Sequence, residues 1–243
     1  MNLKGKVAVV TGGAIRIGRA ISLALAEAGC HVFIVYGQSA QSAEETRVEA
    51  ENMGVRARIY SANLANPVSA QSIIPAAGEW FGRVDVLVNS AALFRTGALT
   101  DTTLANWDLQ FAINLRAPYL LSQAFARQVP ENGQGAIVNI SDARIFRPAP
   151  DHFAYRLTKS GLVAMTEILA QDLAPRIRVN ALALGAILPP PGQDDRYLEA
   201  LAQNKIPLRK PGNLAVVTQN VIHLLEQDFM TGVTIKLDGG EFL

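Results

Sequence analysis

Short apolar runs rich in β-branched residues recur along the chain and alternate with longer segments of mixed polarity. In these segments apolar residues recur at helical spacing, as in RAISLALAEAG, where Ile21, Leu25 and Ala28 share one face. Strands and helices that alternate with short connections predict an α/β fold, in which a mainly parallel sheet is covered by helices on both faces. The runs that predict strands are Val7–Val10, Val32–Tyr36, Val55–Tyr60, Val84–Asn89, Ala136–Ile140, Arg178–Leu182 and Val233–Leu237.

One stretch breaks this rhythm. Residues 188–212, LPPPGQDDRYLEALAQNKIPLRKPG, are proline-rich at both ends, with an amphipathic piece between them. Such a segment is typical of a lid over a site, although an ordinary surface excursion has the same pattern. No linker or internal repeat divides the chain, so residues 1–243 are expected to form a single domain.

Composition and charge narrow the class of protein. Apolar residues make up 49% of the 243 residues and charged residues 18%, as in a globular domain with a large core. A net charge of +1 with no basic run argues against nucleic acid or an anionic membrane as a partner. The lone Cys30 excludes an internal disulfide, and three histidines (His31, His152 and His223) make a metal site unexpected.

The chain is expected to be cytoplasmic. Its N-terminus, MNLKGKVAVVTGG, enters a strand pattern at once, which leaves no room for a signal peptide. No apolar segment approaches the roughly 18 residues that a membrane span requires.

A glycine-rich loop follows the first predicted strand and leads directly into a helix. It reads TGGAIRIG, residues 11–18. Glycines at this place let the backbone turn tightly and approach the pyrophosphate of a dinucleotide, which then lies on the helix N-terminus. The pattern therefore predicts a dinucleotide site, with a tight turn that binds nothing as the alternative.

The end of the second predicted strand indicates which dinucleotide. NAD-preferring proteins place an acidic residue there to bind the ribose hydroxyl. Here the stretch reads VYGQSAQS, and the first acid is Glu44. Arg16, inside the glycine loop, adds a permanent positive charge suited to a phosphate, unless it is simply a solvated loop charge. We therefore expect NADPH to be favoured over NADH.

A tyrosine and a lysine, Tyr155 and Lys159, lie one helical turn apart. A free tyrosine is a poor acid at neutral pH, because its pKa is about 10. A nearby ammonium favours the phenolate and is expected to lower that pKa. The same lysine can bond the nicotinamide ribose, so the pair predicts a proton-donating site; a pair on a helix surface is the alternative.

Across nearly its whole length the chain resembles the short-chain dehydrogenase/reductase family. The resemblance implies a single Rossmann-type domain with a seven-stranded sheet, a small-molecule substrate, and a homotetramer built through the tyrosine-bearing helix and the C-terminal strand. It makes Tyr155 the proton donor, Lys159 its partner and Asn114 the anchor of a proton-relay water. The matches are TGGAIRIG, ANLAN (62–66), LVNSAA (87–92), INLRAP (113–118), VNIS (138–141), YRLTKSG (155–161), IRVNALALG (177–185) and FMTGVTIKLDGG (229–240).

The resemblance also implies which residues bind NADPH or NADP. They are Gly12, Arg16, Ile17, Gly18, Tyr36, Ser39, Asn63, Leu64, Asn89, Ala91, Tyr155, Lys159, Gly185 and Ile187.

Two departures from the common family pattern resemble its pteridine reductase branch. Asp142 replaces the usual serine thirteen residues before the tyrosine, and Arg16 replaces a loop glycine. The branch also has an aromatic residue that sandwiches the pterin, which Phe94 matches. Its usual serine before that aromatic and its arginine near the second strand are replaced by Ala92 and Gln38. The residues implied for substrate binding are Arg16, Phe94, Asp142 and Tyr155.

The chemistry of Asp142 favours a C=N substrate. A carbonyl oxygen needs a hydrogen-bond donor beside the tyrosine, and an ionised carboxylate cannot donate. A pterin offers N–H groups to accept from, and an aspartate beside the phenol raises the phenol's pKa and titrates together with it. We therefore expect an NADPH-dependent reductase of a pterin, dihydropterin or folate-like C=N bond.

Two alternatives stay open. If Ser141 supplies a hydroxyl to the site, or Tyr155 acts alone, the chain is an NADPH-dependent carbonyl reductase of the 3-oxoacyl thioester type. The other alternative is a dinucleotide-binding sensor without catalysis.

Overall fold

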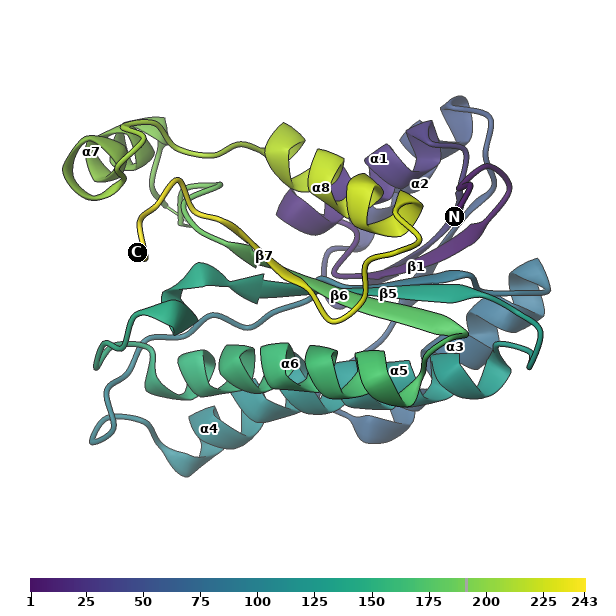
Figure 1. Ribbon diagram of the computed structural model, residues 1–243, viewed down its shortest axis with the longest axis horizontal. Helices are drawn as coiled ribbons and strands as arrows, with labels where there is room; N and C mark the ends of the chain where they lie inside the picture. Colours follow the sequence, from purple (N-terminus) through teal and green to yellow (C-terminus); the bar gives the residue numbers. More distant parts are fainter. Residues whose placement is uncertain (191) are drawn as a thin grey trace.

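The computed structural model describes residues 1–190 and 192–243 and contains one seven-stranded sheet, in which every pair of neighbours is parallel (Figure 1). The strand order is β3-β2-β1-β4-β5-β6-β7, which confirms the predicted doubly wound fold. The strands are β1 (Val7–Thr11), β2 (His31–Tyr36), β3 (Ala57–Ser61), β4 (Val86–Asn89), β5 (Gly135–Asp142), β6 (Ile177–Leu184) and β7 (Thr234–Leu237).

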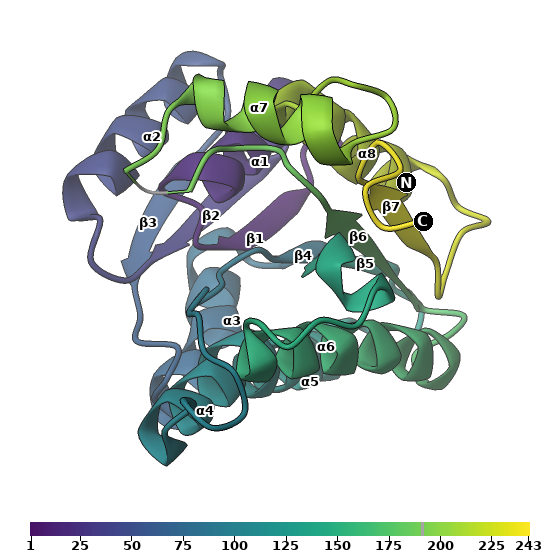
Figure 2. The same cartoon turned by 90° about the vertical axis from the view of Figure 1, so that its left-hand side faces the viewer.

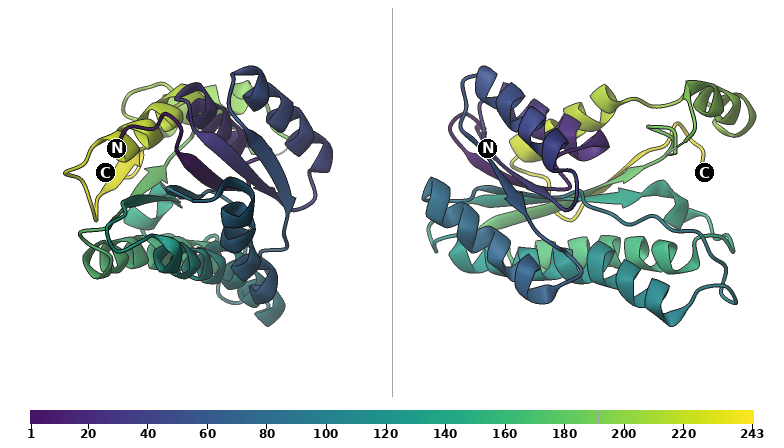
Figure 3. Two further views of the ribbon diagram at one scale, coloured as in Figure 1. Left: turned by 90° about the vertical axis from the view of Figure 1, so that its right-hand side faces the viewer. Right: turned by 180° about the vertical axis from the view of Figure 1, so that it is seen from behind.

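Helices cover both faces of the sheet. Figure 1 shows α1, α2 and α8 on one face and α3 to α6 on the other, and the views in Figure 3 show the same layers from other sides. The α-helices are α1 (Arg16–Glu27), α2 (Ala40–Asn52), α3 (Pro67–Phe81), α4 (Leu104–Phe111), α5 (Ala117–Gln128), α6 (Phe153–Asp172), α7 (Asp195–Lys205) and α8 (Leu214–Glu226); a π-helix spans Ala112–Arg116 and a 3₁₀ turn spans Ala143–Phe146.

The central strands each contain an unbroken apolar run because both of their faces are buried. In β1, Ala8 and Val10 enter the core beneath α1 and α8, while Val7 and Val9 enter the core beneath α3 and α5. All four side chains are at most 1% exposed. A strand buried on both faces shows no alternation of polar and apolar residues, which is why these runs predict a parallel sheet with two helical layers.

The strand order reverses between β1 and β4, and this is where the sheet of an open α/β fold receives its ligands. Thr11, the last residue of β1, accepts hydrogen bonds through Oγ1 from the backbone of Ser90 (3.0 Å) and Ala91 (3.1 Å), just after β4. These bonds hold the two strand ends together. The glycine loop and the segment after β4 therefore emerge side by side.

The proline-rich excursion contains α7, whose first turn is capped by the Asp194 carboxylate. Figures 1 and 2 show α7 on the same side of the sheet as α8. Backbone bonds from Gly212 to Ala186 (2.9 Å) and from Leu208 to Gly239 (3.2 Å) tie the excursion to the rest of the chain. Pro191, inside the expected lid, lies outside the described residues.

Within residues 1–190 and 192–243, no helix has both the length and the apolar character needed to cross a bilayer.

Candidate active site

Asp142 and Tyr155 meet where β5 ends and α6 begins. The Tyr155 hydroxyl donates to Asp142 Oδ2 over 3.0 Å. The other carboxylate oxygen, Oδ1, accepts from the backbone of Arg144 (2.8 Å) and caps the 3₁₀ turn that follows β5. One oxygen is thus fixed by the backbone, and the second is directed at the phenol. The spacing of thirteen residues has brought a carboxylate to the tyrosine, as the sequence indicates.

Ser141, the competing residue, has a different environment. It is 3% exposed, and its hydroxyl donates to the backbone oxygen of Lys159 (3.2 Å). Neighbouring residues of a strand point to opposite faces, so Ser141 and Asp142 cannot both reach the phenol. The Ser141 hydroxyl is therefore committed to the backbone of α6.

Lys159 lies one turn after Tyr155 and is 3% exposed. Its ammonium donates to the backbone oxygen of Ile140 (2.8 Å) and lies 5.8 Å from the centre of the Tyr155 ring. Burial lowers the pKa of Lys159 to about 8, and the negative charge of Asp142 opposes this change.

The expected lowering of the tyrosine pKa by Lys159 is wrong for this arrangement. The pKa of Tyr155 is raised well above 10, first by burial and then by the charge and hydrogen bond of Asp142. The Lys159 ammonium bonds a backbone oxygen and not the phenol, so it does not reverse these effects. Tyr155 is thus held in its protonated form.

Asn114 lies in the π-helix between α4 and α5 and is fully buried. Its amide clamps the backbone of Leu93, accepting from the Leu93 N–H (2.7 Å) and donating to the Leu93 oxygen (2.9 Å). It also donates to Thr158 (3.2 Å), one turn of α6 below the tyrosine. π-Helices often occur at functional sites. Here the turn joins the segment after β4 to the tyrosine-bearing helix.

Phe94 follows Leu93 in a stretch without regular structure, and the residue is 45% exposed. It meets the Tyr155 ring edge-on, with ring centres 4.7 Å apart and planes at 87°. It also stacks on His152, with ring centres 4.3 Å apart and planes at 21°. His152 is a site residue that sequence reasoning missed. The sequence does show a histidine three positions before the tyrosine, a spacing that places the two residues on the same side of a helix.

The glycine loop is packed as closely as its sequence implies. A Cβ on Gly18 would lie 2.0 Å from the Gly12 oxygen, and Gly12 itself has a φ of +63° and adjoins Ala91. Arg16 also adopts a left-handed conformation, with φ 51°, and its guanidinium donates to the Pro189 oxygen (2.8 Å). The loop therefore contacts the start of the expected lid.

The N-terminus of α1 carries no side-chain cap, since Ile15 at the capping position cannot provide one, and no acidic residue lies in the first turn. The backbone N–H groups of this turn, with their positive dipole, suit a phosphate. The residues present therefore fit the pyrophosphate of a dinucleotide.

At the carboxyl end of β2, Tyr36 and Ser39 are half-buried and Gln38 is exposed. The first carboxylate of α2, Glu44, is bound by Arg47 on the same helix. No acidic residue of this turn therefore competes with a phosphate.

The remaining residues predicted to bind a cofactor follow the ends of other strands. Asn63 and Leu64 come after β3, where the Asn63 side chain accepts from the Ala65 backbone (3.0 Å). Gly185 and Ile187 come after β6. Asn89 is the last residue of β4 and is 2% exposed. Its side chain donates to Asn139 on β5 (2.8 Å), and this bond joins two central strands.

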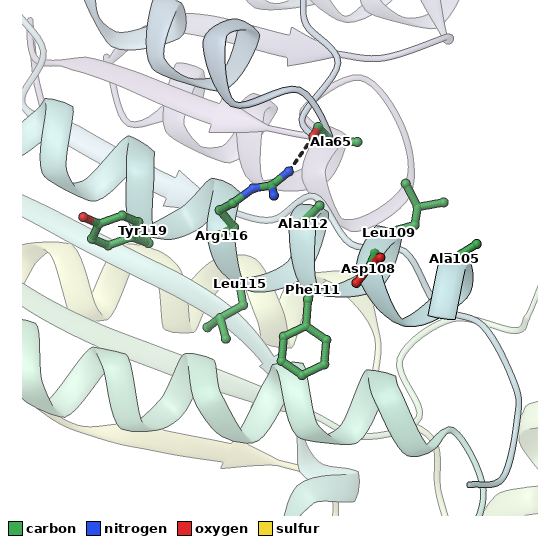
Figure 4. Close-up of a pocket in the computed structure, with 9 residues that line it drawn as sticks. All are labelled: Ala65, Ala105, Asp108, Leu109, Phe111, Ala112, Leu115, Arg116 and Tyr119. Atoms are coloured by element: carbon green, nitrogen blue, oxygen red, sulfur yellow. Dashed lines mark hydrogen bonds between the residues drawn. The ribbon is translucent and has the colours of Figure 1, made fainter. Parts of the chain in front are cut away.

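One hollow has a volume of about 720 Å³, and none of the candidate catalytic residues lines it (Figure 4). It lies along α4, the π-helix and α5, and Arg116 crosses it to donate to the Ala65 oxygen (2.7 Å). No group of three or more potential metal ligands occurs in the part of the chain that the structure describes.

Comparison with known proteins agrees with this geometry. A family model described as enoyl-(acyl carrier protein) reductase matches residues 13–241. The 3-oxoacyl-[acyl-carrier-protein] reductase FabG of Thermotoga maritima is 31% identical over 99% of both chains. A short-chain type dehydrogenase/reductase of Picea abies is 31% identical over 98% of this chain and 93% of its own.

A solved structure of FolM alternative dihydrofolate reductase 1 from Brucella canis, complexed with NADP, is 35% identical. It has a TM-score of 0.91 and covers 100% of this chain and 96% of its own.

Proposed function

Since this chain belongs to the short-chain dehydrogenase/reductase family, we propose that it reduces the C=N bond of a pterin, dihydropterin or folate-like ring with NADPH. The observation that carries the proposal is the position of the Asp142 carboxylate. It stands where the family usually has a serine, and it accepts a hydrogen bond from the Tyr155 hydroxyl. The likeness to a Brucella canis protein named alternative dihydrofolate reductase supports it.

The protein's own residues fit the cofactor. The glycine loop and the uncapped start of α1 suit the pyrophosphate. The Arg16 guanidinium, which bonds the Pro189 oxygen through one nitrogen, adds a permanent positive charge suited to a further phosphate. Lys159 and Tyr155 would hold the nicotinamide ribose. When bound, the nicotinamide supplies a hydride.

Tyr155 supplies the proton that balances this hydride. Its raised pKa keeps the proton on the phenol until the substrate nitrogen becomes basic, when the proton passes from the hydroxyl to that nitrogen. Asp142 accepts an N–H of the substrate, which orients the ring with its C=N bond toward the phenol. The reduced carbon gains C–H, the nitrogen gains N–H, and the buried Lys159 favours the phenolate left behind.

An isotope-transfer experiment with deuterated NADPH tests the proposal. NADPH deuterated at C4 of the nicotinamide should transfer deuterium to the carbon of the reduced C=N bond of 7,8-dihydrobiopterin, giving a tetrahydropterin under anaerobic conditions. If dihydrobiopterin and dihydrofolate are both recovered unreduced with active, NADPH-saturated enzyme, the proposed function is wrong.

A second candidate is the reduction of a 3-oxoacyl thioester, which the similarity to the Thermotoga maritima reductase favours. It requires a hydroxyl that donates to the carbonyl oxygen beside Tyr155. Ser141 is engaged with the Lys159 backbone, and Asp142 cannot donate when ionised. The geometry therefore supports the C=N substrate better.

NADPH should bind at least tenfold more tightly than NADH, a difference of about 1.4 kcal/mol. No carboxylate at the Gln38–Ser39 turn opposes the additional phosphate, and Arg16 attracts it. Fluorescence titration of the purified protein with each cofactor measures the two affinities. Equal or reversed affinities would remove the basis for assigning NADPH.

We also propose that residues 188–212 act as a lid. Arg16 already links the glycine loop to the first part of this segment.

We further propose that the protein is a homotetramer. Among the described residues β7 pairs only with β6, its four residues are half-buried, and Phe229, which precedes it, is 99% exposed. An open edge of this kind suits packing against another copy. Light scattering should give four times the monomer mass of 26.1 kDa; a monomer mass would contradict the assembly.

A further inference from the structure

We propose that His152 is a positioning residue that holds the Phe94 ring in the plane needed to stack a flat heterocyclic substrate. The inference rests on the proposed function, because only a planar substrate uses the face of this ring. It assigns to His152 a role in substrate selection, although the histidine itself takes no part in proton or hydride transfer.

Phe94 needs such support. It lies in the irregular stretch 90–98, and 45% of the residue is exposed. Asn114 clamps the backbone of the preceding Leu93, and the Gly97 oxygen accepts from Phe153 at the start of α6 (2.8 Å). These bonds fix the path of the backbone, but they leave the orientation of the phenyl ring to its own contacts.

The most extensive of these ring contacts is the stack with His152, whose imidazole lies almost parallel to the phenyl ring, 4.3 Å between centres and 21° between planes. Tyr155 contacts the ring only edge-on, and the Arg144 guanidinium lies 5.6 Å from its centre. The imidazole thus covers one face of Phe94. The exposed part of the ring leaves the opposite face for a flat substrate.

His152 is itself held firmly. Only 9% of it is exposed, and its backbone is left-handed, with φ 53° and ψ 42°, at the residue that precedes α6. Its Nδ1 lies 3.1 Å from the Asp151 carboxylate, which Arg156 also binds (2.6 Å). Arg156 in turn donates to the Arg147 oxygen (3.1 Å). The backbone that carries His152 is therefore anchored to the loop between β5 and α6 through Asp151 and Arg156, independently of Phe94.

The polar atoms of the imidazole are not what holds it against Phe94. Its Nε2 is buried and has no hydrogen-bond partner within the described residues, and Nδ1 makes no well-aligned hydrogen bond. Left-handed backbone at a histidine is also uncommon, and such strained residues cluster at functional sites. A buried, strained histidine that uses only its flat face is explained by the stack that it makes.

The experiment compares two substitutions that separate the ring from the backbone. His152→Asn removes the ring but tolerates the left-handed conformation, since asparagine adopts it readily. His152→Phe restores a flat ring without the ring nitrogens. His31→Asn is the matched control, because His31 stacks on Phe81 (6.0 Å, 11°) at the amino end of β2, away from the site.

We expect His152→Asn to raise the KM for 7,8-dihydrobiopterin about tenfold, with kcat within threefold and the Kd for NADPH within twofold of wild type. A general disturbance of the folded structure would also lower kcat and weaken the binding of NADPH. His152→Phe should restore KM to within about threefold of wild type, and His31→Asn should leave it unchanged. A structural defect would not be rescued by phenylalanine, which is less suited to a left-handed backbone.

Three results would overturn the inference. An unchanged KM in His152→Asn means that Phe94 does not depend on the stack. A His152→Phe variant as impaired as His152→Asn means that the ring nitrogens or the backbone matter instead of the flat face. If the wild-type enzyme reduces neither dihydrobiopterin nor dihydrofolate, the proposed function fails first and the role of His152 falls with it.

Discussion

Replacing Tyr155 with phenylalanine is expected to lower kcat for 7,8-dihydrobiopterin by about 10²–10⁴-fold, the range that a positioned proton donor contributes. The substitution removes the only atom of the residue that can give a proton and keeps the ring that meets Phe94 edge-on. NADPH affinity should stay within about twofold, because the glycine loop and Lys159 are untouched. Steady-state kinetics and fluorescence titration of the same preparation measure both quantities.

Tyr119→Phe is the matched control for this substitution. Tyr119 lies on the exposed face of α5 and accepts a hydrogen bond from Gln123 (3.1 Å), so its hydroxyl is bonded but remote from the site. It should retain wild-type turnover. Near wild-type turnover of Tyr155→Phe itself would mean that the proton comes from another group, and the assignment of the site would fail.

Asp142→Ser should lower pterin reduction by about 10–1,000-fold, or about 1.4–4 kcal/mol in the barrier. The change removes the carboxylate that bonds the phenol at 3.0 Å and that, in the proposed reaction, accepts the substrate N–H. Reduction of small ketones should stay level or rise, because a serine hydroxyl donates where the carboxylate cannot. Parallel kinetics on both substrates, with Ser141→Ala as the control, check the assignment. If Ser141 instead serves the substrate, Ser141→Ala should lose activity and Asp142→Ser should retain it.

The pH profile of the same variant gives an independent readout. The pKa of Lys159 is about 8 because burial lowers it, while Asp142 raises it. Raising the pH through that value removes the ammonium, so kcat/KM for NADPH in the wild type should fall above about pH 8. Without the Asp142 charge the pKa of Lys159 drops further, and this fall should begin at lower pH. A basic limb at the same pH in both proteins would contradict the coupling.

Much of the fold follows from residues that the sequence makes visible. Residues 7–10 of β1 are apolar at every position because the strand is buried on both faces, and residues 86–88 of β4 are apolar for the same reason. Strand ends are less visible. β6 continues through Ala183 and Leu184 beyond the predicted Leu182, since its pairing with β5 and β7 extends that far. Pairing partners, and not local pattern, set these limits.

The site was only partly predictable, for physical reasons. The spacing of Asp142 and Tyr155 in the sequence is enough to place the carboxylate by analogy. The environment of Lys159 could not be predicted from the sequence, because the backbone oxygen of Ile140 that binds its ammonium belongs to a different element, the strand β5. That contact keeps the Lys159 ammonium away from the phenol, whose pKa is raised by burial and by Asp142. His152 escaped notice because its role depends on a stack with Phe94, which comes from another segment.

The most direct test of the central claim is the ratio of kcat/KM for 7,8-dihydrobiopterin to kcat/KM for an acetoacetyl thioester, with saturating NADPH and one wild-type preparation. A carboxylate at position 142 that accepts from Tyr155 suits a ring with N–H groups and leaves a carbonyl oxygen without a second donor. We predict that dihydrobiopterin is preferred at least tenfold, about 1.4 kcal/mol in transition-state stabilisation. A preference for the thioester would contradict it.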